Sequence, residues 1–218
     1  QKMITYSHAL GVRDLPFSEI QSYFPWHCTF LNDANAGAFA EGIGSDLPSS
    51  FFYLSLSNTV GGAIFHDGNL LPGDAFRCGE AGHMTLIPGG RPCYCGKTGC
   101  VDSYCSARVL SDLSGGRLKD FFLELQQNNR EYRPVWDTYL KHLSVVINNL
   151  HMILDYDIIL GGYVGSFLTP WLDTIRHLVA ERNTFEDDGS FVKLCTYQTG
   201  AAAYGAAMDV MEEFLRTV

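Results

Sequence analysis

The chain has little charge, and most of the charge it has is negative. Charged residues make up 18% of its 218 residues, with 24 Asp and Glu against 15 Lys and Arg, for a formal net charge of −9. A surface that binds nucleic acid or an anionic membrane needs a clustered basic patch. The Lys and Arg residues are scattered along the sequence, so we expect these residues not to hold nucleic acid on their own.

Long apolar runs and the signs of secretion are missing as well. No hydrophobic stretch reaches the roughly 18–20 residues of a membrane-spanning helix, so we expect no membrane partner. The first residues do not form a secretory signal pattern, and three of the seven cysteines stand at ligand-like spacing. A reducing, cytoplasmic location therefore fits better than a disulfide-bonded secreted domain. A hydrophobic content of 46% is that of an ordinary globular protein with a core.

The most informative feature present is one histidine and three cysteines within eighteen residues, namely His83, Cys93, Cys95 and Cys100. One imidazole and three thiolates make a tetrahedral shell that suits Zn²⁺. Gly96 and Gly99 allow tight turns between the last two thiols. The spacing is not that of a zinc finger, which predicts a metal-binding loop inside a larger fold. The alternative is a set of buried, inert cysteines, which are common singly.

Strand-like and helix-like segments alternate along the chain, which predicts an α/β fold. The expected strands are 28–31, 51–57, 60–65, a return strand from Leu70, 157–160 and 191–195, with an Asp67-Gly68 hairpin turn after the third. The expected helices are 34–41, 101–110, 118–127, a longer one from Pro134, 170–182 and 201–215, the last capped by Thr199.

Three stretches, in this order, resemble the ROK family of bacterial sugar kinases and sugar-responsive transcriptional repressors. They are NDANAGAFAE at 32–41, GEAGH at 79–83 and CYCGKTGCVD at 93–102. The resemblance runs from about residue 11 to about residue 208. It implies the actin-like ATPase fold, built from ribonuclease-H-like α/β halves, with a mixed sheet flanked by helices and a zinc-binding loop.

The resemblance also implies roles for single residues. Asp33 matches the catalytic aspartate that takes the proton from a sugar hydroxyl, although without the flanking motifs an aspartate at this position is more often a plain helix cap. Asn32, Glu80 and His83 match residues that contact the sugar, and His83 would also bind the structural zinc. Asp102 stands where the family has glutamate; it is one methylene shorter and could equally be a solvated helix residue.

The chain departs from the kinase pattern in its phosphate loops. It has no Asp-x-Gly-Gly-Thr sequence, so we expect residues 1–218 to be a sugar-binding C-terminal region without the N-terminal lobe. The second phosphate loop corresponds to SNTVGGA at 57–63, where three of the family's four glycines are replaced by residues whose side chains obstruct the approach of backbone amides to phosphate. Gly61 and Gly62 remain the candidates for contacting a nucleotide. Gly161 and Gly162 match a glycine pair near adenosine, or form only a tight turn.

Two functions follow from these matches and departures. The first is the sugar-sensing effector domain of a ROK-type transcriptional regulator, which would contact DNA only through a module missing from this chain. The second is a truncated ATP-dependent sugar kinase, glucokinase-like, with Asp33 as general base and with ATP and Mg²⁺ as cofactors. In both cases the ligand is a sugar or amino sugar, zinc is structural, and the resemblance implies a homodimer or homotetramer.

Overall fold

The computed structural model describes residues 3–7 and 10–216, and it contains a five-stranded mixed sheet in the order β5-β4-β3-β6-β7. The central strand β3 pairs antiparallel with β4 and parallel with β6, and β7 continues the parallel side. The strand bounds are β3 Phe51–Leu56, β4 Val60–His66, β5 Asn69–Leu70, β6 Asp157–Gly161 and β7 Val192–Leu194. The predicted α/β fold with a mixed sheet flanked by helices is confirmed.

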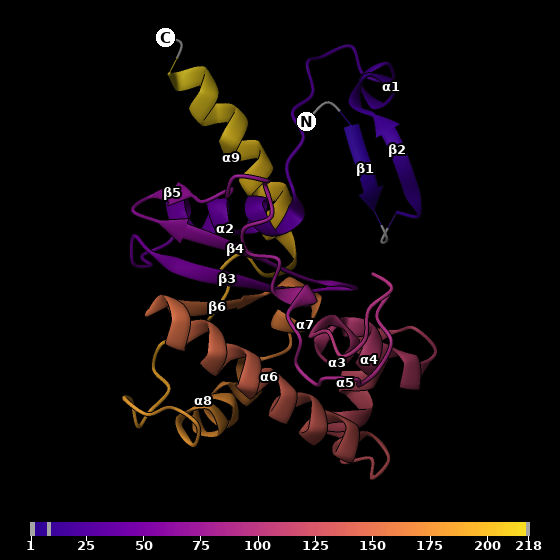
Figure 1. Ribbon diagram of the computed structural model, residues 1–218, viewed down its shortest axis with the longest axis vertical. Helices are drawn as coiled ribbons and strands as arrows, with labels where there is room; N and C mark the ends of the chain where they lie inside the picture. Colours follow the sequence, from indigo (N-terminus) through magenta and orange to yellow (C-terminus); the bar gives the residue numbers. More distant parts are fainter. Residues whose placement is uncertain (1–2, 8–9, 217–218) are drawn as a thin grey trace.

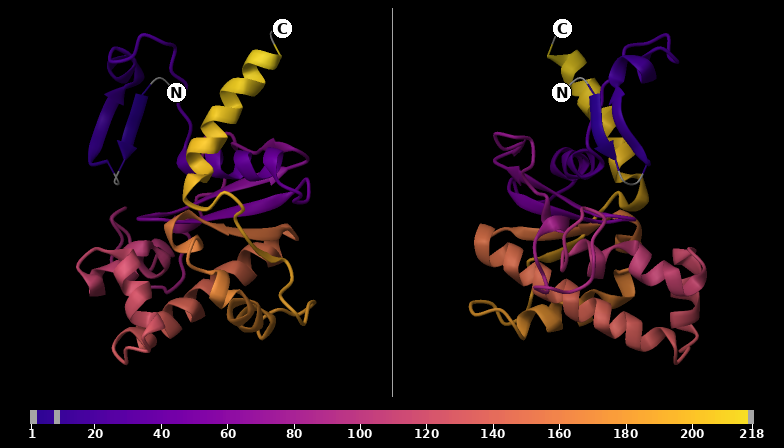
Figure 2. Two further views of the ribbon diagram at one scale, coloured as in Figure 1. Left: turned by 180° about the vertical axis from the view of Figure 1, so that it is seen from behind. Right: turned by 45° about the vertical axis from the view of Figure 1, so that its right-hand side comes forward.

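Helices cover both faces of this sheet (Figure 1). On one face lie α2 (Asp33–Gly44) and α9 (Ala201–Leu215), and on the other lie the long α6 (Tyr132–Leu154) and α8 (Leu172–Ala180). All six residues of β3 are buried, because alternate side chains enter the two cores. The views in Figure 2 show the same layering from behind and from the side.

Four further helices lie on the α6 side of the sheet, toward the cysteine-rich loop. They are α3 (Asp102–Cys105), α4 (Ala107–Ser111), α5 (Leu118–Gln126) and the short α7 (Gly162–Gly165). The expected helix over 101–110 is thus two helices, because Ser106 has extended backbone with φ −73° and ψ 157°. None of the helices in the described ranges is long and apolar enough to cross a bilayer.

The N-terminal part holds elements that the sequence did not predict. A hairpin of β1 (Met3–Ser7) and β2 (Val12–Pro16) leads into α1 (Phe17–Gln21) and stands apart from the main sheet (Figure 1). The strand expected at 28–31 is wrong, since these residues form no strand and are at most half-buried. Phe30 stacks instead on Phe17 at 4.0 Å between ring centroids, so its apolar surface packs toward α1 rather than into a sheet.

Most other boundaries agree with the expectations within a few residues. The turn at Asp67 and Gly68 has φ of 48° and 78°, as a two-residue hairpin with both central residues left-handed requires. The long helix α6 begins at Tyr132, two residues before Pro134. Thr199 does not cap α9; the residue before that helix is Gly200, and no side chain caps it.

Candidate functional site

The start of α2 presents a polar pair to solvent. The Asn32 side chain caps the helix, with Oδ1 accepting from the backbone N–H groups of Ala34 and Asn35 at 3.0 and 3.1 Å. Asp33 is the first helical residue and is exposed, and its Oδ1 accepts from the Ala34 N–H at 3.0 Å. A carboxylate is favoured here by the positive end of the helix dipole.

The second polar pair, Glu80 and His83, lies on a loop packed directly against β4. Glycines make this close approach possible: a Cβ on Gly62 would lie 2.6 Å from the Gly79 carbonyl oxygen, and a Cβ on Gly82 would lie 2.1 Å from that of Val60. Gly79 also has φ +86°, which a side chain rarely adopts.

Gly61 allows a similar close approach between β4 and the start of α2. A Cβ built on Gly61 would lie 3.2 Å from the Cβ of Ala34. Gly61 and Gly62 therefore serve in this structure to bring the start of α2 and the Glu80 loop onto the same strand. Their expected role in binding the phosphates of a nucleotide stays a prediction.

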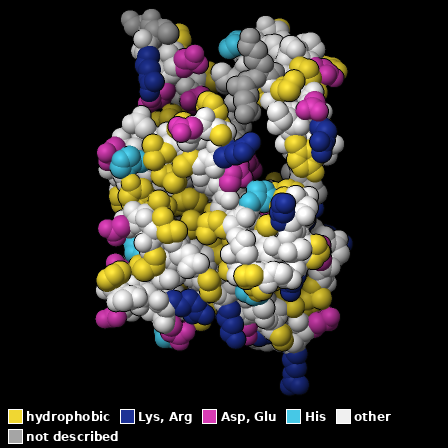
Figure 3. Space-filling view, in the orientation of Figure 1, with side chains coloured by type: hydrophobic (Ala, Val, Ile, Leu, Met, Phe, Trp, Pro, Cys, Tyr) yellow, Lys and Arg dark blue, Asp and Glu magenta, His cyan; other side chains and the backbone are white. Residues whose placement is uncertain are grey.

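These segments line a cleft of about 620 Å³. Its lining includes four of the residues expected to bind sugar, Asn32, Asp33, Glu80 and His83, together with Gly61 and Gly62. The opposite wall comes from the N-terminal hairpin, with Ile4 and Tyr6, and in the space-filling view a hollow separates this hairpin from the body of the molecule (Figure 3). Tertiary structure thus brings residues from three separate segments to one cavity.

Two further lining residues were missed by the sequence analysis. Tyr94 stands between two expected metal ligands, and its hydroxyl lies 3.3 Å from His83 Nε2. Burial raises the pKa of Tyr94, so it remains a neutral phenol that can both donate and accept a hydrogen bond. Asn35, in the first turn of α2, adds an amide to the same wall. The position of Tyr94 inside the cysteine motif was the only signal in the sequence that could have identified it.

Asp102 is not brought to this cleft. Its side chain is buried, and Oδ1 accepts from the Val60 N–H at 2.6 Å. The shorter aspartate is thus used to fix the start of β4, and its carboxylate faces a separate surface hollow that also contains Arg91 and Arg108. The expected sugar contact of Asp102 stays a prediction that this geometry does not favour.

The cysteine loop folds into a compact knuckle beside the cleft. The ligand atoms of His83, Cys93, Cys95 and Cys100 all lie within 4.8 Å of one another, and the Sγ atoms of Cys95 and Cys100 are 3.7 Å apart. Zn–S bonds of about 2.3 Å give a tetrahedron edge of about 3.8 Å, so the sulfur spacing suits this ion. Gly96 and Gly99 have φ of 84° and 80°, as the tight turns require.

The surroundings shift the pKa values of two thiols in this loop in opposite directions. A hydrogen bond from the Lys97 backbone N–H lowers the pKa of Cys95. Burial raises the pKa of Cys100 to about 12, so without a cation this thiol keeps its proton. A divalent ion would displace that proton and make Cys100 a thiolate ligand beside Cys95. The donor set and its spacing therefore fit a zinc ion held by four protein ligands.

Gly161 and Gly162 lie at the end of β6, next to the β3–β4 turn. Gly162 has φ +76°, and a Cβ there would lie 2.7 Å from the Leu56 nitrogen and from Ser57 Oγ. Close packing explains both glycines without a ligand. Ser57 Oγ fills the space between the turn and this pair, where it accepts from the Tyr163 N–H at 3.4 Å.

Comparison with known proteins identifies the class. The ROK family model matches residues 1–213, and the chain belongs to the ROK family. Among curated proteins, the glucokinase of Halalkalibacterium halodurans is 28% identical, with 94% of this chain and 70% of the relative covered. The N-acetylmannosamine kinase of Escherichia fergusonii is 31% identical, with 85% of this chain aligned, and the aligned part spans 65% of that kinase.

Solved structures agree on the fold. A ROK family glucokinase from Streptomyces griseus, in complex with glucose and AMPPNP, superposes with a TM-score of 0.81 at 22% identity, covering 94% of this chain and 75% of the other. A ROK family transcriptional regulator, a homologue of the Escherichia coli MLC protein, gives a TM-score of 0.72 at 20% identity, covering 95% and 59%. The actin-like ATPase fold of the family is thus confirmed, and both branches of the family share it.

Proposed function

We propose that this chain binds a sugar or amino sugar in the cleft between α2, the Glu80 loop and the N-terminal hairpin. The observation that carries the proposal is the meeting of Asn32, Asp33, Glu80 and His83 in one cavity of about 620 Å³. Each sugar hydroxyl both donates and accepts, so carboxylates, an amide and an imidazole around one cavity match its needs. The carboxylates of Asp33 and Glu80 accept hydrogen bonds from sugar hydroxyls, and Asn32 and His83 orient the neighbouring hydroxyls.

The zinc in this proposal is structural. His83, Cys93, Cys95 and Cys100 hold it with four protein donors, which leaves no open position for activating water. The ion supplies rigidity: it fixes His83 and Tyr94 relative to the neighbouring Glu80. The cleft therefore has a preformed wall, which lowers the entropic cost of ordering side chains around a ligand.

We further propose that the chain senses the sugar rather than phosphorylates it, as the effector region of a ROK-type regulator. The β3–β4 turn supports this, because Ser57, Asn58 and Thr59 carry side chains where a phosphate loop needs bare backbone. DNA contact in such a regulator would fall to another module, because this chain is acidic, with a formal net charge of −9.

A sugar kinase is the second candidate. The curated relatives support it, because a glucokinase and N-acetylmannosamine kinases align over most of this chain. The exposed Asp33 at the cleft also supports it, since a general base must reach the hydroxyl that attacks phosphate. In that case ATP and Mg²⁺ are cofactors, and Asp33 takes the hydroxyl proton.

Calorimetric titration of the zinc-loaded chain separates these proposals. Glucose, N-acetylglucosamine and N-acetylmannosamine are titrated first, and AMPPNP with Mg²⁺ is titrated with and without the sugar that binds. A sensor binds sugar but not AMPPNP, and releases no ADP from ATP in a coupled assay. Micromolar AMPPNP binding or sugar-dependent ADP release identifies the kinase, and no binding of any sugar refutes the shared part of the proposal.

Asp33→Asn tests the site itself. We expect sugar affinity to fall by at least about tenfold, since the amide replaces one acceptor oxygen with an NH₂ donor and removes the negative charge that strengthens hydrogen bonds from hydroxyls. Zinc content and the unfolding temperature should stay unchanged. Asp46→Asn, an exposed carboxylate just beyond the other end of the same helix, is the matched control and should bind sugar like the wild type. If the two variants bound sugar with equal affinity, Asp33 would not be a sugar-binding residue.

A further inference from the structure

A second group of metal-ligand side chains lies away from the cleft, at the C-terminal end of α6. The ligand atoms of His151, Asp155 and Glu186 all lie within 4.8 Å of one another. His151 is in the last turn of α6, Asp155 follows the helix with φ 55°, and Glu186 comes from the segment after α8. The three residues belong to segments that only the packing of α8 against α6 brings together.

The buried His151 is oriented toward the two carboxylates. Only 6% of its side chain is exposed, and its ring stacks on Phe191 with 3.6 Å between centroids. Its Nδ1 lies 2.8 Å from the Tyr156 carbonyl oxygen, which can only accept, so Nδ1 carries the proton. In the neutral ring Nε2 then has a free lone pair, and that lone pair faces Glu186 Oε2 at 3.4 Å.

The atom of Glu186 that lies opposite this lone pair is the carboxylate oxygen Oε2. Its Oε2 is buried and has no hydrogen-bond partner among the described residues. The ion pairs found in the described ranges give neither Glu186 nor Asp155 a Lys or Arg partner. The Glu186 backbone is held, because its N–H donates to Asn183 Oδ1 at 3.0 Å. The neutral imidazole and the carboxylate place two lone pairs opposite each other, an unfavourable arrangement that either a proton on Nε2 or a metal cation between the two atoms relieves.

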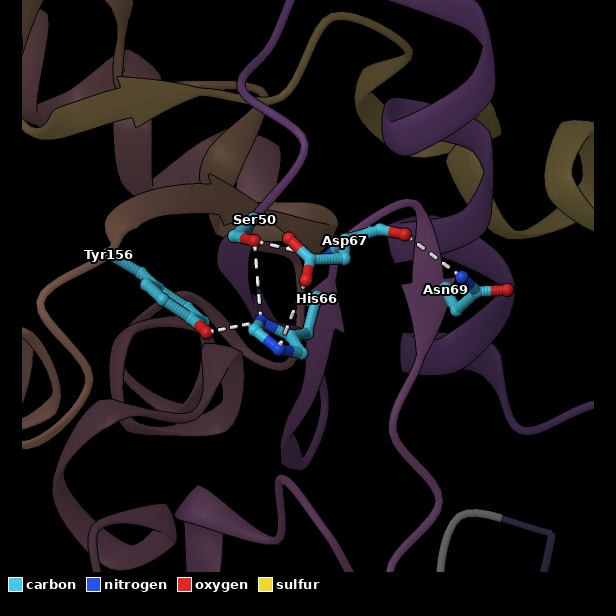
Figure 4. A network of polar contacts seen from close by, with 5 residues as sticks. All are labelled: Ser50, His66, Asp67, Asn69 and Tyr156. Carbon is cyan, nitrogen blue, oxygen red and sulfur yellow. Dashed lines mark hydrogen bonds and ion pairs between the residues drawn. The ribbon is translucent and has the colours of Figure 1, made fainter.

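The Tyr156 carbonyl that orients His151 is itself held in place. The Tyr156 hydroxyl hydrogen-bonds His66 Nδ1, and Ser50 Oγ lies 3.4 Å from the same nitrogen (Figure 4). The rings of Tyr156 and His66 stack with an interplanar angle of 12°. A metal-binding histidine usually donates its other N–H to a carbonyl or carboxylate that is fixed in this way. His151 therefore has the outer support of a metal ligand.

We propose that His151, Asp155 and Glu186 bind a divalent first-row transition cation, of the Zn²⁺ and Mn²⁺ class. One imidazole and two carboxylates form a mixed N/O donor set for such ions, and water completes the coordination. Ligand atoms at about 2.1 Å from one ion lie at most about 4.2 Å apart, so a small rotation of the two carboxylates closes the site. The ion clamps the segment after α8 to the end of α6. The proposal is independent of the sugar site.

Mn²⁺ is the probe that separates this site from the cysteine loop, because it prefers carboxylate and water to thiolate. The full chain is first loaded with one equivalent of zinc, which the thiolates take in preference to carboxylates, and free Mn²⁺ is then followed by electron paramagnetic resonance during titration. We expect one Mn²⁺ per chain in the wild type, together with a rise in unfolding temperature. Glu186→Gln, which keeps the shape of the side chain, should weaken Mn²⁺ binding at least about tenfold and abolish that rise.

Asp187→Asn is the matched control, since it removes the same charge from the neighbouring exposed residue. It should bind Mn²⁺ like the wild type. His151→Gln, measured only if its circular dichroism spectrum matches the wild type, should behave like Glu186→Gln. The proposal is overturned if the wild type binds no Mn²⁺ at millimolar concentration, or if Glu186→Gln and Asp187→Asn bind it equally.

Discussion

The two halves of the candidate sugar site are held in place in different ways. The Glu80 and His83 half belongs to a local knuckle, in which backbone hydrogen bonds such as Cys93 N to Lys97 O, at 2.8 Å, span only a few residues. The Asn32 and Asp33 half sits on α2, which is anchored at its far end across the chain. There Glu41 Oε1 accepts from Cys195 Sγ at 2.9 Å and from the Tyr197 N–H at 3.0 Å.

This difference assigns each half its own source of stability. The knuckle has few apolar contacts of its own and exposes His83 and Cys95, so we expect it to depend on a metal ion. The α2 half depends on the core, because Glu41 is fully buried and Ala36, Ala38 and Ala40 pack against the sheet and α9. Perturbing either half should therefore leave the other largely intact.

The largest effect should follow from breaking the knuckle with Cys95→Ser. Losing one thiolate ligand removes much of a metal-binding free energy that is on the order of 10 kcal/mol in small zinc domains. We expect zinc loss by elemental analysis, faster hydrogen exchange over residues 84–101, and weaker sugar binding by titration, with α2 still protected.

Cys28→Ser is the control, since Cys28 lies outside the cysteine cluster. It should keep zinc, exchange and affinity at wild-type values. If Cys95→Ser also left the metal content and the sugar affinity unchanged, the knuckle would not be a metal site and its support of the cleft would be disproved.

A smaller effect should come from the junction between the halves, through Gly62→Ala. The new methyl group would lie 2.6 Å from the Gly79 carbonyl oxygen and 2.5 Å from the Phe52 ring. Overpacking of this kind costs about 1–3 kcal/mol. We expect a lower free energy of unfolding in urea and weaker sugar binding, with zinc retained.

Gly200→Ala serves as the comparison, because a Cβ at Gly200 would meet no atom within 4 Å. Its stability and affinity should match the wild type. Unchanged sugar affinity in a destabilised Gly62→Ala protein would show that the spacing between the Glu80 loop and β4 does not position the ligand.

The smallest effect concerns the anchor of α2 and its dependence on pH. Burial, followed by the hydrogen bond to Glu41, raises the pKa of Cys195 to about 12, above the 9.0 of a free thiol. The unfolded chain therefore loses this proton first as pH rises above 9, and stability falls from there until the folded thiol also ionises near 12.

Between pH 8 and 10 this group should account for roughly 1 kcal/mol of lost unfolding free energy. Cys195→Ser, whose hydroxyl can still donate to Glu41 and does not ionise in this range, should remove that part of the alkaline slope. Urea unfolding at both pH values measures it. An identical slope in the variant and the wild type would mean that Cys195 is not the group that titrates.

How much the sequence could predict differs between the same two regions. The cysteine knuckle was predicted residue by residue, since its ligands lie within eighteen residues and its turns need Gly96 and Gly99. The strands β3, β4 and β6 were predicted from short apolar runs bounded by turn residues. The N-terminal hairpin was missed, because it stands apart from the sheet and is largely exposed, so its sequence carries no clear buried pattern.

Asp102 shows the limit of motif matching. The motif placed an acidic residue at the right position, but the shorter side chain bonds the Val60 N–H instead of facing the cleft. Ser106 likewise interrupts a segment that was predicted as one continuous helix. In both cases a single long-range or backbone contact outweighs the local pattern, and such contacts leave no periodic trace in a sequence.

The sequence by itself determined the family, the alternation of strands and helices, and the cysteine knuckle, because each rests on residues close together in the chain. Tertiary structure decided which acids share the cleft, why β4 needs its glycines, and that His151, Asp155 and Glu186 meet at all. These features depend on how separate segments pack, and packing follows from the shape of the whole core rather than from any one stretch of it.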